Sequence, residues 1–315
     1  MIKIHKKRPY FTRFLFAFIL LFILAFPCCS CASTDTIDEQ DGKSFIWKIS
    51  DDDSFVYLLG SIHIASSDIY PLASSIENAF QESDKLVVEI NIKEVGPITT
   101  MLLFEKYGTY PAGGGLKQNL DEDLYKRLEA SLEEMGVSIS AYDGYRPWVV
   151  VTLTQETVMV EKEYSAEHGI DIYFLEKAVE RDMEILELET VEYQLKLMSD
   201  FPDELMILMI EKSLEPPGLD DYIDIIGYMF KQWKKGSVEG IEEVVFKDLE
   251  EEPSLAPYYE VFLYQRNYEM MDKIEEYLTD EYTYFIVVGA GHLVGEEGLL
   301  NLLEEAGYEV EQLGD

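Results

Sequence analysis

The sequence has 315 residues, 47% of them apolar and 13% aromatic, which is enough to build a full core and excludes a largely disordered chain. Its formal charge is −37, and without the five basic residues among the first 13 the rest of the chain carries −42. Such a surface repels phosphate backbones, so it argues against nucleic acid as a partner, and it is compatible with cationic peptides or metal ions.

The first 31 residues predict a signal peptide. The basic segment MIKIHKKRPYFTR precedes an apolar run from Phe14 to Phe26 and then the small-residue cluster PCCSCAS. The apolar run has 13 residues, fewer than the roughly 20 that a membrane-spanning helix needs. We therefore expect an exported protein of the cell envelope, lipid-anchored or secreted, that meets a membrane only through this segment.

All three cysteines lie in that cluster, at Cys28, Cys29 and Cys31, so the body of the chain cannot form a disulfide. Their placement resembles a bacterial lipoprotein signal, in which a cysteine just after the apolar run is lipidated and becomes the new N-terminus. Cys31 is the candidate for lipidation. Simple cleavage after Ala32 and an uncleaved anchor are the alternatives.

Strand and helix patterns alternate after a polar spacer at residues 32–44. FIWKI and FVYLLG predict strands around the acidic turn SDDDS, and PLASSIENAFQESD predicts a helix with Pro71 in its first turn. KLVVEIN predicts the next strand. A strand, helix, strand unit predicts neighbouring parallel strands joined by a right-handed crossover.

The middle of the chain, about residues 97–280, has a mostly helical pattern. Amphipathic runs end at Gly136 and Gly236, DMEILELE predicts a strand between them, and LEPPGLDD predicts a loop. The segment from 282 to 313 again predicts strand, helix, strand. We therefore expect one α/β domain over residues 45–315, with a parallel or mixed sheet built from the N- and C-terminal thirds, flanking helices and a helical insertion in the middle.

Two of the three histidines outside the leader occupy matched positions. His63 in LLGSIHIAS and His292 in VVGAGHLVG each stand three residues after a glycine and just past an apolar run. Ligands collect at the carboxyl ends of strands in an open parallel sheet, and Gly60, Gly289 and Gly291 would let the backbone turn tightly there. A single loop histidine commonly caps a helix or binds a carbonyl, but two at matched positions indicate a shared site.

Three other polar residues are candidates for the same edge of the sheet. Glu89 in LVVEIN is costly to bury unless a cation, a metal or a hydrogen-bond donor meets it, and the alternative is an exposed strand end. Arg266 either supplies a positive charge to this edge or lies on a helix surface, and the local sequence favours the surface. Asp171 in EHGID is a weaker candidate, and the neighbouring His168 fits a surface or helix-end position.

Several common motifs do not occur in the sequence. GAGHLVG is not a dinucleotide fingerprint, because the third glycine is displaced to Gly295 and two glutamates, Glu296 and Glu297, crowd the helix start. The sequence has no GxxxxGK loop, no HExxH and no GxSxG. Common zinc proteases and esterases of the α/β-hydrolase kind are therefore disfavoured.

The segments LLGSIHIAS, KLVVEIN, ILELETVEYQ, RNYEMMDKI and FIVVGAGHLVGEEGLLNLLEEAGYEV together resemble the TraB/GumN family, which is related to the Tiki metalloproteases. They occur in the expected order from about residue 45 to the end. The resemblance implies a fold of the erythromycin-esterase and ChaN-like kind. From the Tiki branch it implies divalent-metal-dependent peptide cleavage by His63, Glu89, Arg266 and His292, while some bacterial members are linked to binding or sequestering peptide pheromones.

On chemical grounds, one divalent ion, Mn, Co or Zn, would be held by His63, His292 and Glu89. The ion would keep positions open for water and for the carbonyl of a peptide or protein substrate. Glu89, if not a ligand, would act as base, and Arg266 would stabilise the oxyanion. Without metal, a histidine and a glutamate can activate water for ester hydrolysis. A non-catalytic peptide- or haem-binding lipoprotein is the remaining alternative, because histidine is a good haem ligand.

Overall fold

A computed structural model describes residues 42–111, 114–161, 164–215 and 219–315, so the leader and Cys31 lie outside the described residues. Within these ranges one mixed sheet has the strand order β4-β3-β5-β2-β1-β6. Strands β2, β5, β3 and β4 run parallel, and β1 is antiparallel to both β2 and β6. The strands are β1 (Lys43–Ser50), β2 (Phe55–Ser61), β3 (Lys85–Val88), β4 (Glu184–Glu187), β5 (Tyr284–Gly289) and β6 (Glu309–Gly314).

Helices form most of the rest of the described chain. The α-helices are α2 (Ser74–Glu82), α3 (Pro97–Gly108), α4 (Leu116–Asn119), α5 (Glu122–Glu134), α6 (Pro147–Glu161), α7 (Ile170–Glu180), α8 (Val191–Asp200), α9 (Asp203–Ser213), α10 (Leu219–Lys234), α11 (Val238–Glu251), α12 (Ala256–Tyr259), α13 (Gln265–Leu278) and α14 (Leu299–Ala306). Short 3₁₀ turns are η1 (Ser67–Ile69), η2 (Ile139–Ala141), η3 (Ala166–His168), η4 (Pro253–Leu255) and η6 (Ala290–His292), and η5 (Glu260–Tyr264) is a π-helix.

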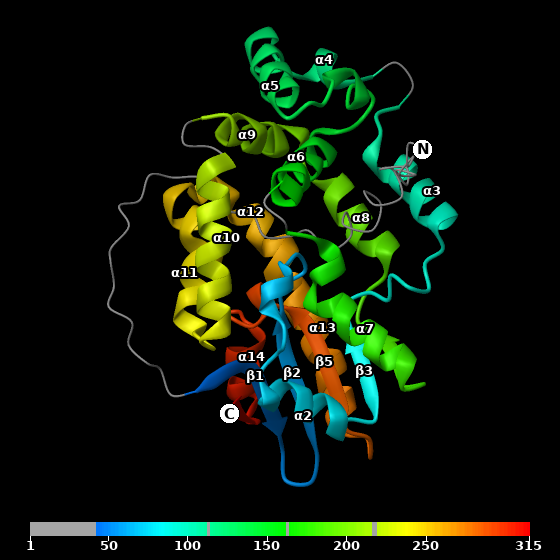
Figure 1. The fold of residues 1–315 in the computed structure, drawn as a ribbon, viewed down its shortest axis with the longest axis vertical. Helices are drawn as coiled ribbons and strands as arrows, with labels where there is room; N and C mark the ends of the chain where they lie inside the picture. The colour runs from blue at the N-terminus through cyan, green and yellow to red at the C-terminus, as the bar shows by residue number, and fades with distance from the viewer. Residues whose placement is uncertain (1–41, 112–113, 162–163, 216–218) are drawn as a thin grey trace, which may run out of the picture.

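The sheet occupies one half of the molecule and the helical insertion covers the carboxyl ends of its parallel strands (Figure 1). Helices α2 and α7 lie on one face of the sheet, and α13 and α14 lie on the other (Figure 1). Because both faces are covered, β5 is buried at all six positions, which explains why YFIVVG reads as an uninterrupted apolar run. The α/β prediction, with a mixed sheet and a helical middle, is confirmed.

The strand order corrects one expectation from the sequence. Strands β2 and β3 are parallel, as the strand, helix, strand pattern predicts, but they are not neighbours, because β5 lies between them and pairs with both. The strand predicted at DMEILELE is β4, on the outer side of β3. The carboxyl ends of β2, β5 and β3 therefore stand side by side, and any residues that follow them meet at one edge.

Local features near the helix ends follow the sequence with one exception. Gly136 and Gly236 have φ of 73° and 65°, as expected for glycines that end the helices α5 and α10. Pro71, by contrast, precedes α2 rather than lying in its first turn, and it follows a cis peptide bond after Tyr70. Residues 216–218 of the predicted LEPPGLDD loop are outside the described ranges, and α10 already begins at Leu219.

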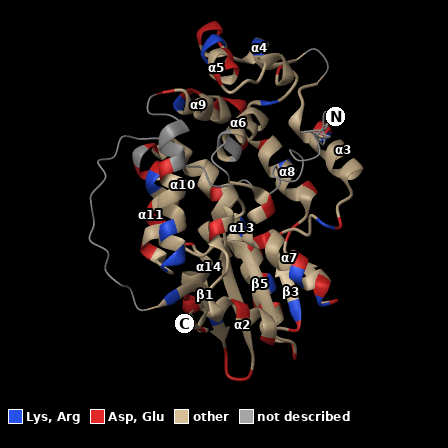
Figure 2. Cartoon of the chain, viewed as in Figure 1, with Lys and Arg blue, Asp and Glu red and all other residues tan. Residues whose placement is uncertain are grey.

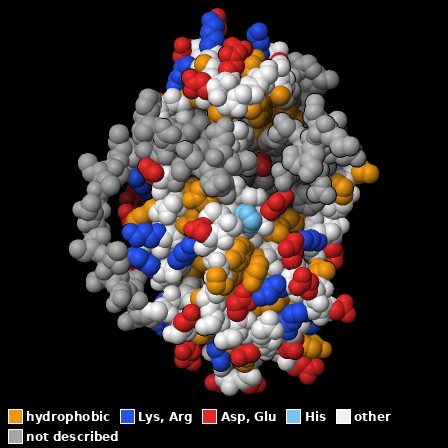
Figure 3. Space-filling view, viewed as in Figure 1, with side chains coloured by type: hydrophobic (Ala, Val, Ile, Leu, Met, Phe, Trp, Pro, Cys, Tyr) orange, Lys and Arg blue, Asp and Glu red, His pale blue; other side chains and the backbone are white. Residues whose placement is uncertain are grey.

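Charged side chains are spread over the described surface rather than concentrated near the strand ends. The acidic turn between β1 and β2, at residues 51–53, forms the tip of the molecule farthest from the helical insertion (Figure 2). Acidic and basic side chains are mixed on the face of the sheet half shown in Figure 3. In the part of the chain that the structure describes, no helix is both long enough and apolar enough to cross a bilayer.

Candidate active site

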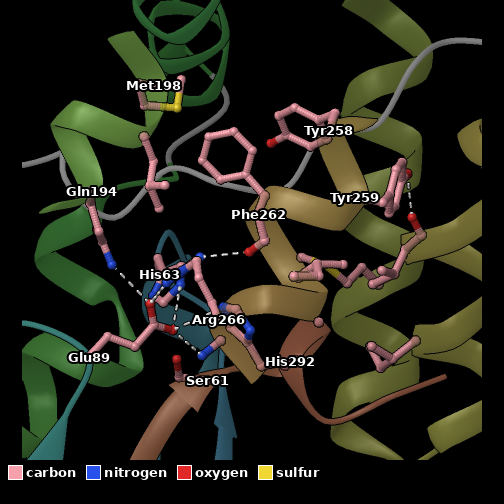
Figure 4. A pocket seen from close by; sticks show the side chains of 18 of the residues that line it. Ser61, His63, Glu89, Gln194, Met198, Tyr258, Tyr259, Phe262, Arg266 and His292 are labelled. Atoms are coloured by element: carbon pink, nitrogen blue, oxygen red, sulfur yellow. Dashed lines mark hydrogen bonds and ion pairs between the residues drawn. The ribbon is translucent and has the colours of Figure 1, made fainter. Parts of the chain in front are cut away.

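A polar cluster lies where the three central parallel strands end. His63 follows β2, Glu89 comes directly after β3, and His292 lies in η6 immediately after β5. Arg266 reaches the same place from α13, on one face of the sheet. Figure 4 shows these four side chains pointing toward one another. The structure thus brings together all four residues that the sequence singled out.

The first glycines of the two GxxH segments, Gly60 and Gly289, allow neighbouring side chains to pack close to the backbone and do not form a tight turn. None of Gly60, Gly289 and Gly291 has a positive φ, which corrects the expectation that they permit unusual backbone conformations. A Cβ at Gly60 would lie 2.5 Å from ring carbons of Phe45. A Cβ at Gly289 would lie 2.9 Å from His63 Nε2, too close for any side chain, so glycine lets that nitrogen approach the backbone.

Glu89 is the centre of the cluster, and it is buried, with 6% of its surface exposed, so the exposed-strand-end alternative is wrong. Its Oε1 accepts a hydrogen bond from the Gly289 N–H at 2.6 Å and lies 4.0 Å from His63 Nε2 and 3.8 Å from His292 Nε2. Burial alone would raise the pKa of Glu89, but Arg266 and the two histidines outweigh it and lower that pKa to about 2. Glu89 therefore provides a fixed negative charge and is a weak base.

Arg266 is buried, with 4% of its surface exposed, so the helix-surface position favoured by its local sequence is wrong. Its Nη2 donates to Glu89 Oε2 at 2.6 Å and to Glu189 Oε2 at 2.8 Å, and its Nε donates to Glu189 Oε1 at 2.7 Å. Nη1 donates to the carbonyl of Phe262, within the π-helix η5, at 3.0 Å. Four of the five guanidinium N–H groups are thus engaged, so Arg266 holds two carboxylates in place and has little capacity left for an oxyanion.

Glu189 and Gln194 complete this network, and the sequence interpretation missed both. Gln194 Nε2 donates to Glu189 Oε2 at 2.7 Å and to Glu89 Oε2 at 3.2 Å. Glu189 stands just after β4 as Glu89 stands just after β3, and its backbone N–H donates to the Glu89 carbonyl at 2.7 Å. Glu189 lies two residues after β4 in EILELE, where acidic and apolar residues alternate, so the signal that identified Glu89, a carboxylate within an apolar run, is absent there.

His292 is held as a neutral imidazole with a defined tautomer. Its Nδ1 lies 2.6 Å from Asn267 Oδ1, and the amide of Asn267 donates from Nδ2 to the carbonyl of Glu297 at 2.6 Å. The Asn267 oxygen must therefore accept from Nδ1–H, which leaves a lone pair on Nε2. Burial and the charge of Arg266 lower the pKa of His292 to about 3 and keep it neutral.

His63 has a carboxylate partner that the sequence ranked only as a weak candidate. Asp171, in the first turn of α7, accepts from His63 Nδ1 at 2.8 Å and from Ser61 Oγ at 2.9 Å. Burial alone would lower the pKa of His63, but the attraction of Asp171 and Glu89 is stronger and raises it. The site therefore favours a positive charge at His63. The other residue of that segment, His168, lies at the end of η3, as expected.

The donor set of this cluster bears on the expected metal. Among the described residues, no group of three or more His, Cys, Asp and Glu side chains is arranged to hold a metal ion, so the predicted three-ligand site of His63, His292 and Glu89 is not formed. The imidazoles of His63 and His292 nevertheless fit an ion. Each Nδ1 atom is held by a hydrogen-bond acceptor, and each Nε2 atom faces Glu89 Oε1. A Cβ at Gly289 would lie 2.9 Å from His63 Nε2 and 3.3 Å from Glu89 Oε1, so a side chain at this position would crowd both groups.

A cavity of about 80 Å³ opens from the polar cluster into the helical insertion. The polar cluster forms one end, and side chains from α6, α8, α10, α11, α12 and η5 form the walls. Figure 4 shows Met198, Phe262 and Tyr258 on the side away from Glu89. The sequence predicted the edge of the sheet at which the site lies, but it did not predict that the helical insertion would enclose the site.

Comparison with known proteins gives a family and a set of relatives. The model of the TraB/PrgY/gumN family matches residues 45–312. The "Uncharacterized protein YbaP" of Escherichia coli (strain K12) is 26% identical over 254 residues, which cover 78% of this chain and 87% of that protein. No solved structure matches this chain.

Animal relatives are more distant. The "Metalloprotease TIKI1" of Danio rerio is 21% identical over 321 residues, which cover 87% of this chain and 64% of that protein. The "Metalloprotease TIKI homolog" of Nematostella vectensis is 21% identical over 339 residues, covering 91% of this chain and 70% of that protein. This chain thus spans somewhat less than two thirds of the first of these metalloproteases.

Proposed function

Because the chain belongs to the TraB/PrgY/gumN family, we propose that it is a divalent-metal-dependent peptidase whose site is built on His63 and His292. The relatives named metalloproteases support the reaction class, and the geometry of the two imidazoles supports the site. The observation that carries the proposal is that both Nε2 atoms face one carboxylate oxygen, at 4.0 Å and 3.8 Å, while both Nδ1 atoms are tied to acceptors.

Each protein group has a separable task in this proposal. His63 and His292 would hold the ion through Nε2, and the fixed negative charge of Glu89 would favour a cation between them. Arg266 keeps the Glu89 carboxylate ionised and oriented by donating to it, and Glu189 holds the Arg266 guanidinium in place. When bound, a divalent ion supplies a water of lowered pKa and polarises the substrate carbonyl.

The raised pKa of His63 is consistent with a cation in this place. Asp171 and Glu89 favour a proton on His63 despite the nearby charge of Arg266, and a divalent ion would replace that proton. Metal binding should therefore release a proton and weaken as the pH falls. His292, already neutral, would lose no proton.

A second candidate is a metal-independent esterase, and the pair of His63 with Asp171 favours it. The 2.8 Å hydrogen bond from Nδ1 to Asp171 orients the imidazole and leaves Nε2 as the nitrogen that would take a proton from water. Haem binding, by contrast, is disfavoured by the space available. The cavity of about 80 Å³ is well below the roughly 300–1,000 Å³ of pockets for drug-sized ligands.

The expected setting of the reaction remains part of the proposal. We propose an exported protein that acts on peptide or protein substrates in the cell envelope, with a membrane contact through its N-terminal segment alone. The strongly acidic composition, −37 overall, supports the view that nucleic acid is not a partner. Mn, Co and Zn are the ions to test.

Metal analysis and a peptide-library assay on the same purified protein test the proposal. We expect one divalent ion per chain, cleavage that stops with EDTA and returns with Mn, Co or Zn, and loss of both ion and cleavage in His63→Ala and His292→Ala. The matched control is His168→Ala, which removes the third histidine of the described chain without touching the cluster.

The outcomes separate the candidates. Hydrolysis of esters that EDTA leaves intact, with loss in His63→Ala and Asp171→Asn, would replace the metal mechanism by the histidine–aspartate one. Peptide binding without turnover under any of the three ions would identify a binding protein. Unchanged cleavage in both histidine variants would refute the site itself.

A further inference from the structure

The end of the cavity away from Glu89 is lined by apolar side chains. Figure 4 shows Met198 of α8 and Phe262 of η5 on that side, and Met229 of α10, Val245 of α11 and Leu263 of η5 also line the cavity. Met198, Met229 and Phe262 are buried. This lining is not needed by the polar cluster, which has its partners at the sheet edge.

No opposite charge is available at that end. Among the described residues lining the cavity, the acidic, basic and histidine side chains are His63, Glu89, Arg266 and His292, and all four belong to the polar cluster. A charged side chain entering the apolar end would lose its hydration without gaining an ion pair, which costs far more than burying an apolar group gains. The lining therefore selects for uncharged, apolar groups.

The volume of the cavity limits the size of such a group. A cavity of roughly 150 Å³ lined by apolar side chains takes a benzene molecule. The cavity here has about 80 Å³, and its polar end must also admit the reacting groups. A small aliphatic side chain fits these dimensions, whereas an aromatic one does not.

Gly291 controls this space without being required by the backbone. It lines the cavity and its φ is not positive, so alanine can occupy this position without strain. A Cβ built there would lie 3.6 Å from Val245 Cγ2 and 3.8 Å from Leu263 Cδ2, which are ordinary van der Waals distances. Alanine would therefore narrow the apolar end by one methyl group and leave its neighbours in place.

We propose that this apolar end is a specificity pocket for a small aliphatic side chain next to the scissile peptide bond, and that the absent side chain of Gly291 sets its size. The position of the pocket beside a scissile bond rests on the proposed peptidase function. The apolar character of the pocket rests on its lining residues alone. Substrates are then peptides with Ala, Val or Leu at one position beside the cleaved bond. Peptides with Asp, Lys or Trp at that position are not cleaved.

Two measurements on the full protein test the pocket. Cleavage of a peptide library in the presence of Mn, Co or Zn should show kcat/KM at least about tenfold higher with Val or Leu than with Asp, Lys or Trp at one flanking position. Gly291→Ala should lower kcat/KM for the Leu peptide by about 10- to 200-fold, the usual effect of one methylene in an apolar pocket, and leave the Ala peptide nearly unchanged. Independently of turnover, N-acetyl-leucinamide should raise the melting temperature of the wild type, while N-acetyl-aspartamide should not, and Gly291→Ala should abolish the rise.

The matched control is Gly227→Ala on α10, where an added Cβ meets nothing within 4 Å and the residue is exposed. It should behave as the wild type in both measurements. Cleavage with no preference for aliphatic residues would overturn the pocket and leave the peptidase standing. Selective binding of N-acetyl-leucinamide without any cleavage would support the pocket and overturn the peptidase. Absence of both selective binding and cleavage would overturn both proposals.

Discussion

Glu156, in the middle of α6, should make the stability of the protein fall as the pH rises from 5 to 8. Its surface is 6% exposed, and its Oε2 has no hydrogen-bond partner among the described residues. Burial raises its pKa from 4.5 to about 8. The carboxyl group is therefore neutral in the folded protein at neutral pH, although it is ionised in the unfolded chain.

The sign and the size of the effect follow from linkage. Below pH 4.5 both states carry the proton, so Glu156 adds no penalty to folding. Above it the unfolded chain loses the proton first, and the free energy of unfolding falls by about 1.4 kcal/mol per pH unit until the folded group also ionises near pH 8. Between pH 5 and pH 8 this amounts to about 4 kcal/mol, and Glu156→Gln, which cannot ionise, should not show it.

Urea unfolding at pH 5, 6.5 and 8 measures the difference, with tryptophan fluorescence as the signal. We expect Glu156→Gln to have a stability equal to or below that of the wild type at pH 5, because its buried amide also lacks partners, and to exceed the wild type at pH 8. The matched control, Glu134→Gln on the exposed surface of α5, should track the wild type at every pH. A constant difference between Glu156→Gln and the wild type across the three pH values would refute the reasoning.

Three further predictions concern the site and the leader. Gly289→Ala should abolish cleavage, because its Cβ would lie 2.9 Å from His63 Nε2 and crowd it, and the rate of cleavage of any peptide that the wild type cleaves checks this. Asp171→Asn should reduce metal affinity or activity by about 10- to 100-fold, since the amide can donate to Nδ1 and move the proton to Nε2, and metal titration with activity assays measures it. Mass spectrometry of the mature N-terminus should find a lipidated Cys31.

A specific result would contradict each of these three predictions, and the two substitutions also have control variants. Gly144→Ala, where an added Cβ meets nothing within 4 Å, controls for the glycine substitution, and an active Gly289→Ala would show that this close approach is not needed. Asp200→Asn, on the exposed end of α8, controls for the amide substitution, and full activity of Asp171→Asn would leave Asp171 a structural role only. A free Ser33 at the mature N-terminus would exclude the lipoprotein.

The sequence predicts those parts of the site that depend on strand ends, and it fails for those that depend on long-range pairing. His63, Glu89 and His292 each follow an apolar run, and strand ends of parallel sheets converge, so their meeting could be anticipated. Arg266 could not be placed in the same way. Its neighbours Tyr268 and Glu269 are exposed, as in a surface helix, and it is buried only because Glu189 and Glu89 meet it from distant parts of the chain.

The fold shows the same division. The apolar runs predict the strands, and two glycines predict the ends of α5 and α10, but strand order depends on which strand edges meet, and local patterns do not encode that. The strand, helix, strand pattern from residue 55 to residue 88 gives no sign that a strand from the far end of the chain, β5, lies inside it. The role of Gly289 beside His63 Nε2 was likewise not predictable. In a sequence, a glycine that close packing requires cannot be distinguished from a glycine that a turn requires.

The central place of β5 links completion of the sheet to the order in which the chain is made. Tyr284 pairs with Val56 on one side and with Lys85 on the other, so the two early strands cannot join until almost the whole polypeptide has emerged. Until then their backbone groups are open to other chains, and contacts this distant in sequence form slowly. A chain that ends before β5 would lack His292 and would leave β2 and β3 with exposed edges, which makes aggregation rather than partial activity the expected fate of truncated products.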